Sequence, residues 1–126
     1  MCSPALAARQ RDFSTPHQHK NICLLIADRK GISFVRFARY LAEKDIVMDN
    51  ILELSSIEAI KRSAMSNLGV TILPRFAAEH ELEAGLLEEI DTHMQNKTIT
   101  AVYAYHKNKW ISSAMERLIS LLKENI

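Results

Sequence analysis

Two short segments contain residues that could bind a ligand. Residues 30–34 and 54–56 each lie where an apolar, strand-like run changes to a helical pattern. In an open parallel sheet, ligands bind at the carboxyl ends of the strands, beside helix N-termini whose free N–H groups favour anions. The hydroxyl groups of Ser33, Ser55 and Ser56 would add hydrogen-bond donors there. Serines at such positions also serve simply as helix caps.

The cysteine and histidine residues form no pattern typical of catalysis or metal binding. Cys2 and Cys23 have no neighbouring base that would activate a thiol, and two cysteines fit no zinc spacing. His17 and His19 would supply only two ligands from one segment, and the other three histidines stand alone. We therefore expect no enzyme activity, no metal site and no cofactor.

The composition is typical of one soluble globular domain. Of the 126 residues, 48% are apolar and 25% are charged, which is enough apolar material for one core. With 2 Cys and a formal net charge of +1, the chain has neither a disulfide framework nor the basic charge of a nucleic-acid-binding protein. No apolar run approaches the roughly 18 residues of a membrane span. The composition by itself suits a cytoplasmic protein that binds a small molecule or another protein, or a small enzyme.

Strand-like and helical patterns alternate from residue 21 onward. The predicted strands cover residues 22–27, 51–54, 70–73, 86–90 and 98–105. The predicted helices cover residues 32–43, 56–68, 76–84 and 112–126. Strands that alternate with helices indicate an α/β fold with a mostly parallel sheet flanked by helices.

Capping residues mark the expected helix ends. Ser55 with Glu58, and Ser113 with Glu116, have the spacing of a capping box, in which each side chain accepts a hydrogen bond from a backbone N–H at the other position. Gly69 would suit the left-handed position that follows the second helix.

The first 18 residues differ from the rest of the chain. They mix Ser, Pro, Gln, His and Arg without a sustained apolar period, and they have no apolar stretch of a secretory signal. We predict that residues 1–18 form a loose tail or a non-native leader, and that the domain spans residues 19–126.

Three motifs follow one another in the middle of the chain. SIEAIK covers Ser56–Lys61, GVTILP covers Gly69–Pro74, and ELEAGL covers Glu81–Leu86. In this order, and with the flanking segments 24–46 and 98–126, they resemble the effector-binding domain of LysR-type transcriptional regulators. The resemblance extends over about residues 21–126.

The resemblance implies a fold like the second subdomain of type II periplasmic binding proteins, in which two α/β subdomains enclose a small effector. By position, Ile32, Ser33 and Phe34 match one ligand-side loop, and Ser55 and Ser56 match the next. We therefore expect these five residues to contact a small, anionic metabolite.

The helix-turn-helix domain and most of the first subdomain have no counterpart in the chain. The resemblance thus implies a truncated regulatory domain that does not bind DNA by itself and has no membrane partner. The alternative is an oligomerisation module, or a non-functional fragment without a working ligand pocket.

The last predicted helix has an unusually complete apolar stripe, formed by Met115, Leu118, Ile119, Leu122 and Ile126. In the family that this chain resembles, the first subdomain covers the corresponding helix. Burying each such side chain stabilises a protein by roughly 1.5–3 kcal/mol, so an exposed stripe favours association. We expect a homo-oligomer, or a last helix that folds back onto its own sheet.

Overall fold

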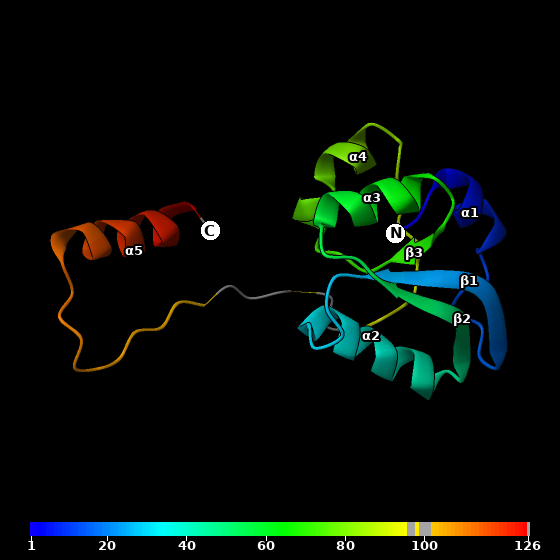
Figure 1. Cartoon of the computed structure of the whole chain (residues 1–126), viewed down its shortest axis with the longest axis horizontal. Helices are drawn as coiled ribbons and strands as arrows, with labels where there is room; N and C mark the ends of the chain where they lie inside the picture. The colour runs from blue at the N-terminus through cyan, green and yellow to red at the C-terminus, as the bar shows by residue number, and fades with distance from the viewer. Residues whose placement is uncertain (96–97, 99–101, 126) are drawn as a thin grey trace.

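The computed structural model describes residues 1–95, 98 and 102–125 (Figure 1). Its elements, in chain order, are α1 (Pro4–Arg9), β1 (Gln18–Ile26), α2 (Ile32–Glu43), β2 (Ile46–Glu53), α3 (Ile57–Met65), β3 (Gly69–Thr71), the 3₁₀ helix η1 (Arg75–Ala77), α4 (Glu79–Glu83) and α5 (Ser113–Asn125). The predicted α/β class with a parallel sheet and flanking helices is confirmed. No helix among the described residues is long and apolar enough to cross a membrane.

The sheet has three strands in the order β2-β1-β3, and both pairings are parallel. Leu24 and Leu25 of the central strand are fully buried, and they belong to two different hydrophobic clusters. Leu24 packs in the cluster that includes Phe37 of α2, whereas Leu25 packs with Ile60 of α3. Because neighbouring side chains of a strand point to opposite faces, α2 and α3 cover opposite faces of the sheet (Figure 1).

The N-terminal segment is part of the core, so the expectation of a loose tail at residues 1–18 is wrong. Cys2, Leu6 and Phe13 are buried with residues of α2 and the sheet. Met1 and Thr71 exchange two backbone hydrogen bonds of 2.8 Å each. Before β1, the only regular elements in this segment are the bridge between Cys2 and Glu88 and the six-residue helix α1. Both are too short to show an apolar period in the sequence. That the segment is a non-native leader, with a domain boundary at residue 19, stays a prediction.

Neither serine predicted to cap a helix does so, because in each helix an adjacent serine accepts the capping hydrogen bond. The hydroxyl oxygens of Ser56 and Ser112 accept hydrogen bonds from the backbone N–H three residues later, over 3.4 and 3.2 Å. Ser56 has the extended backbone that an N-cap requires, with φ −128° and ψ 130°. Ser55 and Ser113 are not the caps, because the adjacent serines accept these hydrogen bonds.

The prediction that Gly69 adopts the left-handed conformation after α3 is wrong. Asn67 has the positive φ, of 64°, and Gly69 is the first residue of β3. A Cβ atom at Gly69 would lie 2.1 Å from the carbonyl oxygen of Cys23. Glycine is required here by the close approach of β3 to β1.

The chain between β3 and residue 90 is less regular than predicted. The expected helix over residues 76–84 is divided into η1 and α4, and Gly85 follows with the expected positive φ, of 71°. The expected strand over residues 86–90 is reduced to one antiparallel bridge between Glu88 and Cys2.

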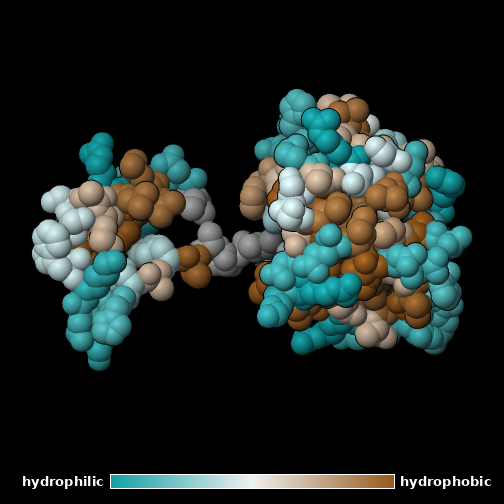
Figure 2. Space-filling model, viewed as in Figure 1, coloured by the Kyte–Doolittle hydropathy of each residue, from teal (hydrophilic) through white to brown (hydrophobic). Residues whose placement is uncertain are grey.

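The C-terminal part stands apart from the main body (Figure 1). The predicted buried strand over residues 98–105 is wrong for residues 102–105, which are exposed and form no strand, and residues 99–101 lie outside the described residues. Among residues 113–125, α5 buries no side chain and does not fold back onto the sheet; Ile126 lies outside the described residues. Figure 2 shows apolar side chains gathered on one side of this lobe. A strand needs a hydrogen-bonded neighbour and an amphipathic helix needs a covering surface, and neither is provided here.

Candidate ligand-binding cavity

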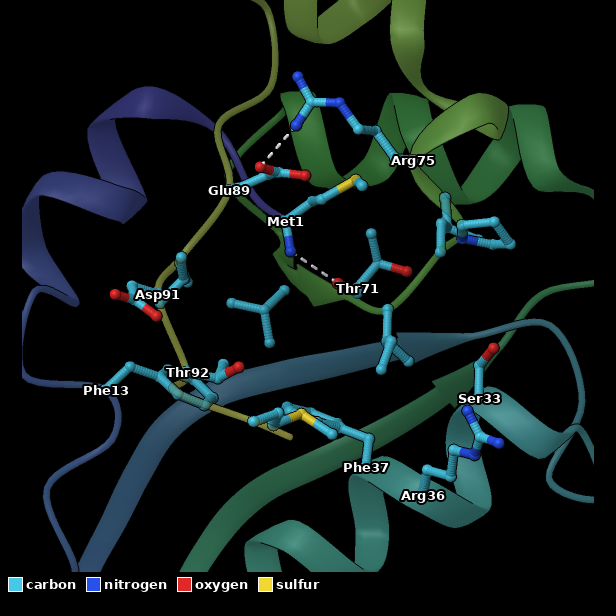
Figure 3. A pocket seen from close by; sticks show the side chains of 16 residues that line it. Met1, Phe13, Ser33, Arg36, Phe37, Thr71, Arg75, Glu89, Asp91 and Thr92 are labelled. Carbon is cyan, nitrogen blue, oxygen red and sulfur yellow. Dashed lines mark hydrogen bonds and ion pairs between the residues drawn. The ribbon is translucent and has the colours of Figure 1, made fainter. Parts of the chain in front are cut away.

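A cavity of about 660 Å³ lies at the carboxyl end of β3 (Figure 3). Its walls are the N-terminal half of α2, the segment after β3, and residues 89–94, which return across the domain. Phe13 and Met1 from the N-terminal segment also line it. The segment that seemed outside the domain in sequence therefore contributes to the cavity.

The structure brings one of the five predicted contact residues to this cavity, namely Ser33. Ile32 is 62% exposed beside it, and Phe34 packs against the hydrophobic core. Ser55 and Ser56 are exposed at the start of α3 and do not line the cavity. The N-terminus of α2 borders the cavity, whereas no residue of α3 lines it. Effector contact by these five residues stays a prediction.

Sequence reasoning missed most of the residues that line the cavity, and Arg36 is one of them. It follows Ser33 by three positions, which places both side chains on one face of α2. Figure 3 shows them beside each other at the same end of the cavity. The Nη1 atom of Arg36 donates a hydrogen bond of 3.1 Å to the carbonyl oxygen of Thr98. The i, i+3 spacing was a usable signal, but it does not distinguish a cavity-lining arginine from a solvated one.

The opposite wall is held by an ion pair between Arg75 and Glu89, with 2.8 Å between Nη1 and Oε2 (Figure 3). The pair joins the segment after β3 to the segment that returns over the domain. Both side chains remain substantially exposed, at 67% and 49%, so the pair adds at most about 1 kcal/mol to stability. Its effect is to position the wall.

Three stacked aromatic rings lie beneath the cavity. The ring centroids of Phe13 and Phe37 are 6.2 Å apart, and those of Phe37 and Tyr40 are 5.8 Å apart. Burial, together with the charge of Asp91, raises the pKa of the Tyr40 hydroxyl. The buried Tyr40 hydroxyl has no hydrogen-bond partner among the described residues. The stack fixes the position of the α2 turn that carries Arg36.

Lys20 packs against the Phe13 ring at one end of this stack. The Nζ atom of Lys20 lies 4.6 Å from the ring centroid of Phe13 and donates hydrogen bonds to the side-chain oxygens of Gln10 and Gln18. Burial lowers the pKa of Lys20. The attraction of the cation to the ring face fastens β1 to the N-terminal segment.

The charges around the cavity are unevenly placed. Arg36 lies beside the N-terminus of α2, whereas Asp91 lies on the far side of the cavity (Figure 3). The positive end of the helix dipole adds to the Arg36 charge at one end. The α2 end of the cavity is therefore its more positive end, and the aromatic rings of Phe13 and Phe37 line the cavity as well.

The described residues contain no group of three or more His, Cys, Asp or Glu side chains that could hold a metal ion.

Comparison with known proteins agrees with this architecture. The family model of the LysR substrate binding domain matches residues 1–126. The chain belongs to this family. The match includes residues 1–18. This agrees with the burial of Cys2, Leu6 and Phe13, which makes this segment part of the core. The predicted family, the substrate-binding domain of LysR-type regulators, is thereby confirmed.

Two bacterial relatives in the LysR substrate-binding family illustrate the similarity. The HTH-type transcriptional regulator YfiE of Escherichia coli K12 is 38% identical over 125 residues, which is 99% of this chain and 42% of that protein. The HTH-type transcriptional regulator YwqM of Bacillus subtilis 168 is 35% identical over 78 residues, which is 62% of this chain and 26% of that protein. The chain thus spans less than half the length of these regulators. No solved structure matches it significantly.

Proposed function

We propose that this chain is the effector-sensing part of a LysR-type regulator, and that it binds a small anionic metabolite in the cavity beside α2. The observation that carries this proposal is the joint placement of Ser33 and Arg36 at the α2 end of a cavity of about 660 Å³. A cavity of this size suits a small molecule.

The N-terminus of α2 is better suited to an anion than that of α3. Gly31 is the N-cap of α2 and has no side chain to accept a hydrogen bond from the first turn. In α3, the Ser56 hydroxyl already accepts one from a first-turn N–H. Uncapped N–H groups and the positive helix end favour an anion, and the Arg36 guanidinium adds a charge-assisted donor. The effector would then be held by Ser33 and Arg36, with Ile32 at the rim.

Regulation of transcription would require a longer protein than this chain. The similar proteins YfiE and YwqM are HTH-type regulators that extend well beyond this chain. We therefore propose that effector binding here acts on DNA through a separate helix-turn-helix domain, and that this part alone does not bind DNA or catalyse a reaction. A cytoplasmic location and a homo-oligomeric state accompany this function.

Thermal unfolding in the presence of small anions tests the proposal. We would record melting with a panel of small carboxylates, phosphates and sulfate. A ligand at 100 times its Kd stabilises the native state by about 2.7 kcal/mol when it binds that state alone. We expect one chemical class to raise the melting temperature, and Arg36→Ala to abolish the shift.

Arg39→Ala is the matched control, because Arg39 is also exposed on α2 but does not line the cavity. It should leave the anion-dependent shift unchanged. A cooperative melt that none of the three anion classes shifts would contradict the proposal. That result would favour the alternative, a scaffold or oligomerisation module without a working pocket.

A further inference from the structure

One hydrogen bond marks the place where the C-terminal part of the chain leaves the main body. Among the described residues, the last hydrogen bond between the two parts runs from the Nη1 atom of Arg36 to the carbonyl oxygen of Thr98, over 3.1 Å. The hydrogen bonds of residues 102–125 join only residues of that same range. Because this part stands apart from the body (Figure 1), the direction in which it leaves depends on how Thr98 is held.

The segment that leads to Thr98 is attached by side chains rather than by strand pairing. Glu88 exchanges two backbone hydrogen bonds with Cys2, of 3.1 and 2.8 Å. From residue 89 to residue 95, no backbone–backbone hydrogen bond joins the segment to another described residue. Its side chains hold it instead, through packing on the hydrophobic core and through the ion pair with Arg75. The segment can therefore shift at a lower cost than a paired strand.

Arg36 belongs to the cavity as well as to this attachment point. Its side chain lies beside Ser33 at the α2 end of the cavity (Figure 3). A guanidinium has five N–H donors in one plane, and the carbonyl oxygen of Thr98 accepts from one of its nitrogen atoms. A carbonyl oxygen and an anion can thus bind to the same guanidinium, and each bond restricts the orientation of the group for the other.

We propose that Arg36 couples the cavity to the C-terminal part, so that an anionic effector bound at Arg36 and the hydrogen bond to Thr98 strengthen each other. This inference rests on the proposed function, because the effector is the anion assigned to the cavity there. The physical cause is conformational entropy. The first partner to bind immobilises the long Arg36 side chain, so the second partner meets a side chain that has already lost its freedom. Such a coupling acts equally in both directions.

Trypsin cleavage of the native chain measures the attachment. Lys97 directly precedes Thr98, so trypsin can cut after Lys97 only when Thr98 is released into the active site of the protease. Mass spectrometry separates this cut from the cut after Lys107, which serves as an internal control in the C-terminal part. Without added anion, we expect Arg36→Ala to accelerate the cut after Lys97 about two- to tenfold, which corresponds to the loss of one hydrogen bond. Arg39→Ala should leave both rates unchanged.

The effect of an anion is tested with small carboxylates, phosphates and sulfate, each compared with chloride at equal ionic strength. An anion that raises the melting temperature should slow the cut after Lys97 about fivefold and leave the cut after Lys107 unchanged. Arg36→Lys keeps the positive charge but loses the planar fork of donors. This variant should therefore keep part of the rise in melting temperature and lose the effect of the anion on the cut after Lys97.

The outcomes distinguish this coupling from the proposed function. An anion that raises the melting temperature without slowing the cut after Lys97 would overturn the coupling and leave the proposed function standing. A faster cut in the presence of the anion would also overturn it, since the anion would then compete with Thr98 for Arg36. A rate that is indifferent to Arg36→Ala would show that the hydrogen bond does not hold the segment. A melting temperature that no anion changes would overturn both proposals.

Discussion

The backbone of Gly69 approaches the carbonyl oxygen of Cys23 so closely that a Cβ atom at residue 69 would lie 2.1 Å from that oxygen. The contact joins β3 to β1, and the loop that lines the cavity follows directly after β3. The obstacle is a backbone atom of the central strand, which cannot move aside as a flexible side chain can. The position of one wall of the cavity therefore depends on the absence of a side chain at residue 69.

Gly69→Ala should destabilise the domain strongly. Overpacking in a core costs about 1–3 kcal/mol, and we expect the upper end of this range or more because the clash is with backbone. Gly31→Ala is the comparison and should cost less, since its Cβ would lie 3.1 Å from the carbonyl oxygen of Asp28, a tight contact but not a severe clash. Chemical denaturation of both variants measures the difference. Equal stability of the two variants would contradict the close approach of the strands.

Phe13→Ala should show that the N-terminal segment is integral to the fold. Phe13 is 1% exposed and stacks on Phe37, and truncation of a buried phenylalanine costs about 3–5 kcal/mol. Phe76 is 77% exposed, so Phe76→Ala should change the free energy of unfolding by less than about 0.5 kcal/mol. If Phe13→Ala were as mild as the control in urea unfolding, the segment would be a loose tail after all.

Ser56→Ala and Ser55→Ala should differ, although the residues are adjacent. The Ser56 hydroxyl caps α3, and its loss should cost about 0.5–2 kcal/mol. Ser55 is exposed and is not the cap, so its replacement should be close to neutral. Thermal melts of the two variants at one pH compare them. A larger loss for Ser55→Ala would support the capping box expected from the sequence.

An ion pair between Lys61 and Glu81 should make stability depend on pH. The Nζ atom of Lys61 lies 2.9 Å from Oε1 of Glu81, and it joins α3 to α4. The hydrogen bond from Lys61 lowers the pKa of Glu81 below its usual value of 4.5. The native state therefore favours the ionised carboxylate. The resulting stabilisation is fully present above pH 4.5 and is lost as the pH falls through the native pKa.

Glu81→Gln should therefore be less stable than the wild type at pH 7, and the difference should shrink as the pH falls below about 4.5. Glu83→Gln is the control, because Glu83 is exposed on the same helix. Urea unfolding at several pH values gives both curves. A Glu81→Gln difference that is constant from pH 7 to pH 3 would show that the carboxylate charge does not contribute.

Much of the fold follows from local patterns. The continuous apolar run 22–27 predicts the central strand, because a strand covered on both faces has no polar side to display. Apolar spacing predicts α2 and α3, and the predicted stop at Gly85 agrees with its positive φ. Each of these features depends on neighbours in the sequence.

The cavity could be predicted only in part. Ser33 was expected at a ligand site, but Arg36 was not, since nothing in the sequence shows which turn of α2 faces the returning segment 89–94. Ser55 and Ser56 were expected at the same site and lie elsewhere. The walls of the cavity come from segments far apart in the sequence, namely α2, the segment after β3 and residues 89–94, and local patterns do not show that these segments meet.

The sequence by itself determined the family, the α/β class and most of the regular elements, because motif order, apolar period and turn residues act over short distances. Tertiary structure decided what depends on contacts between distant residues. It placed Cys2 and Phe13 in the core, required glycine at residue 69, and left residues 102–105 without a strand partner. The physical reason is that burial and hydrogen-bond pairing depend on which surfaces meet, and local patterning does not specify the partner.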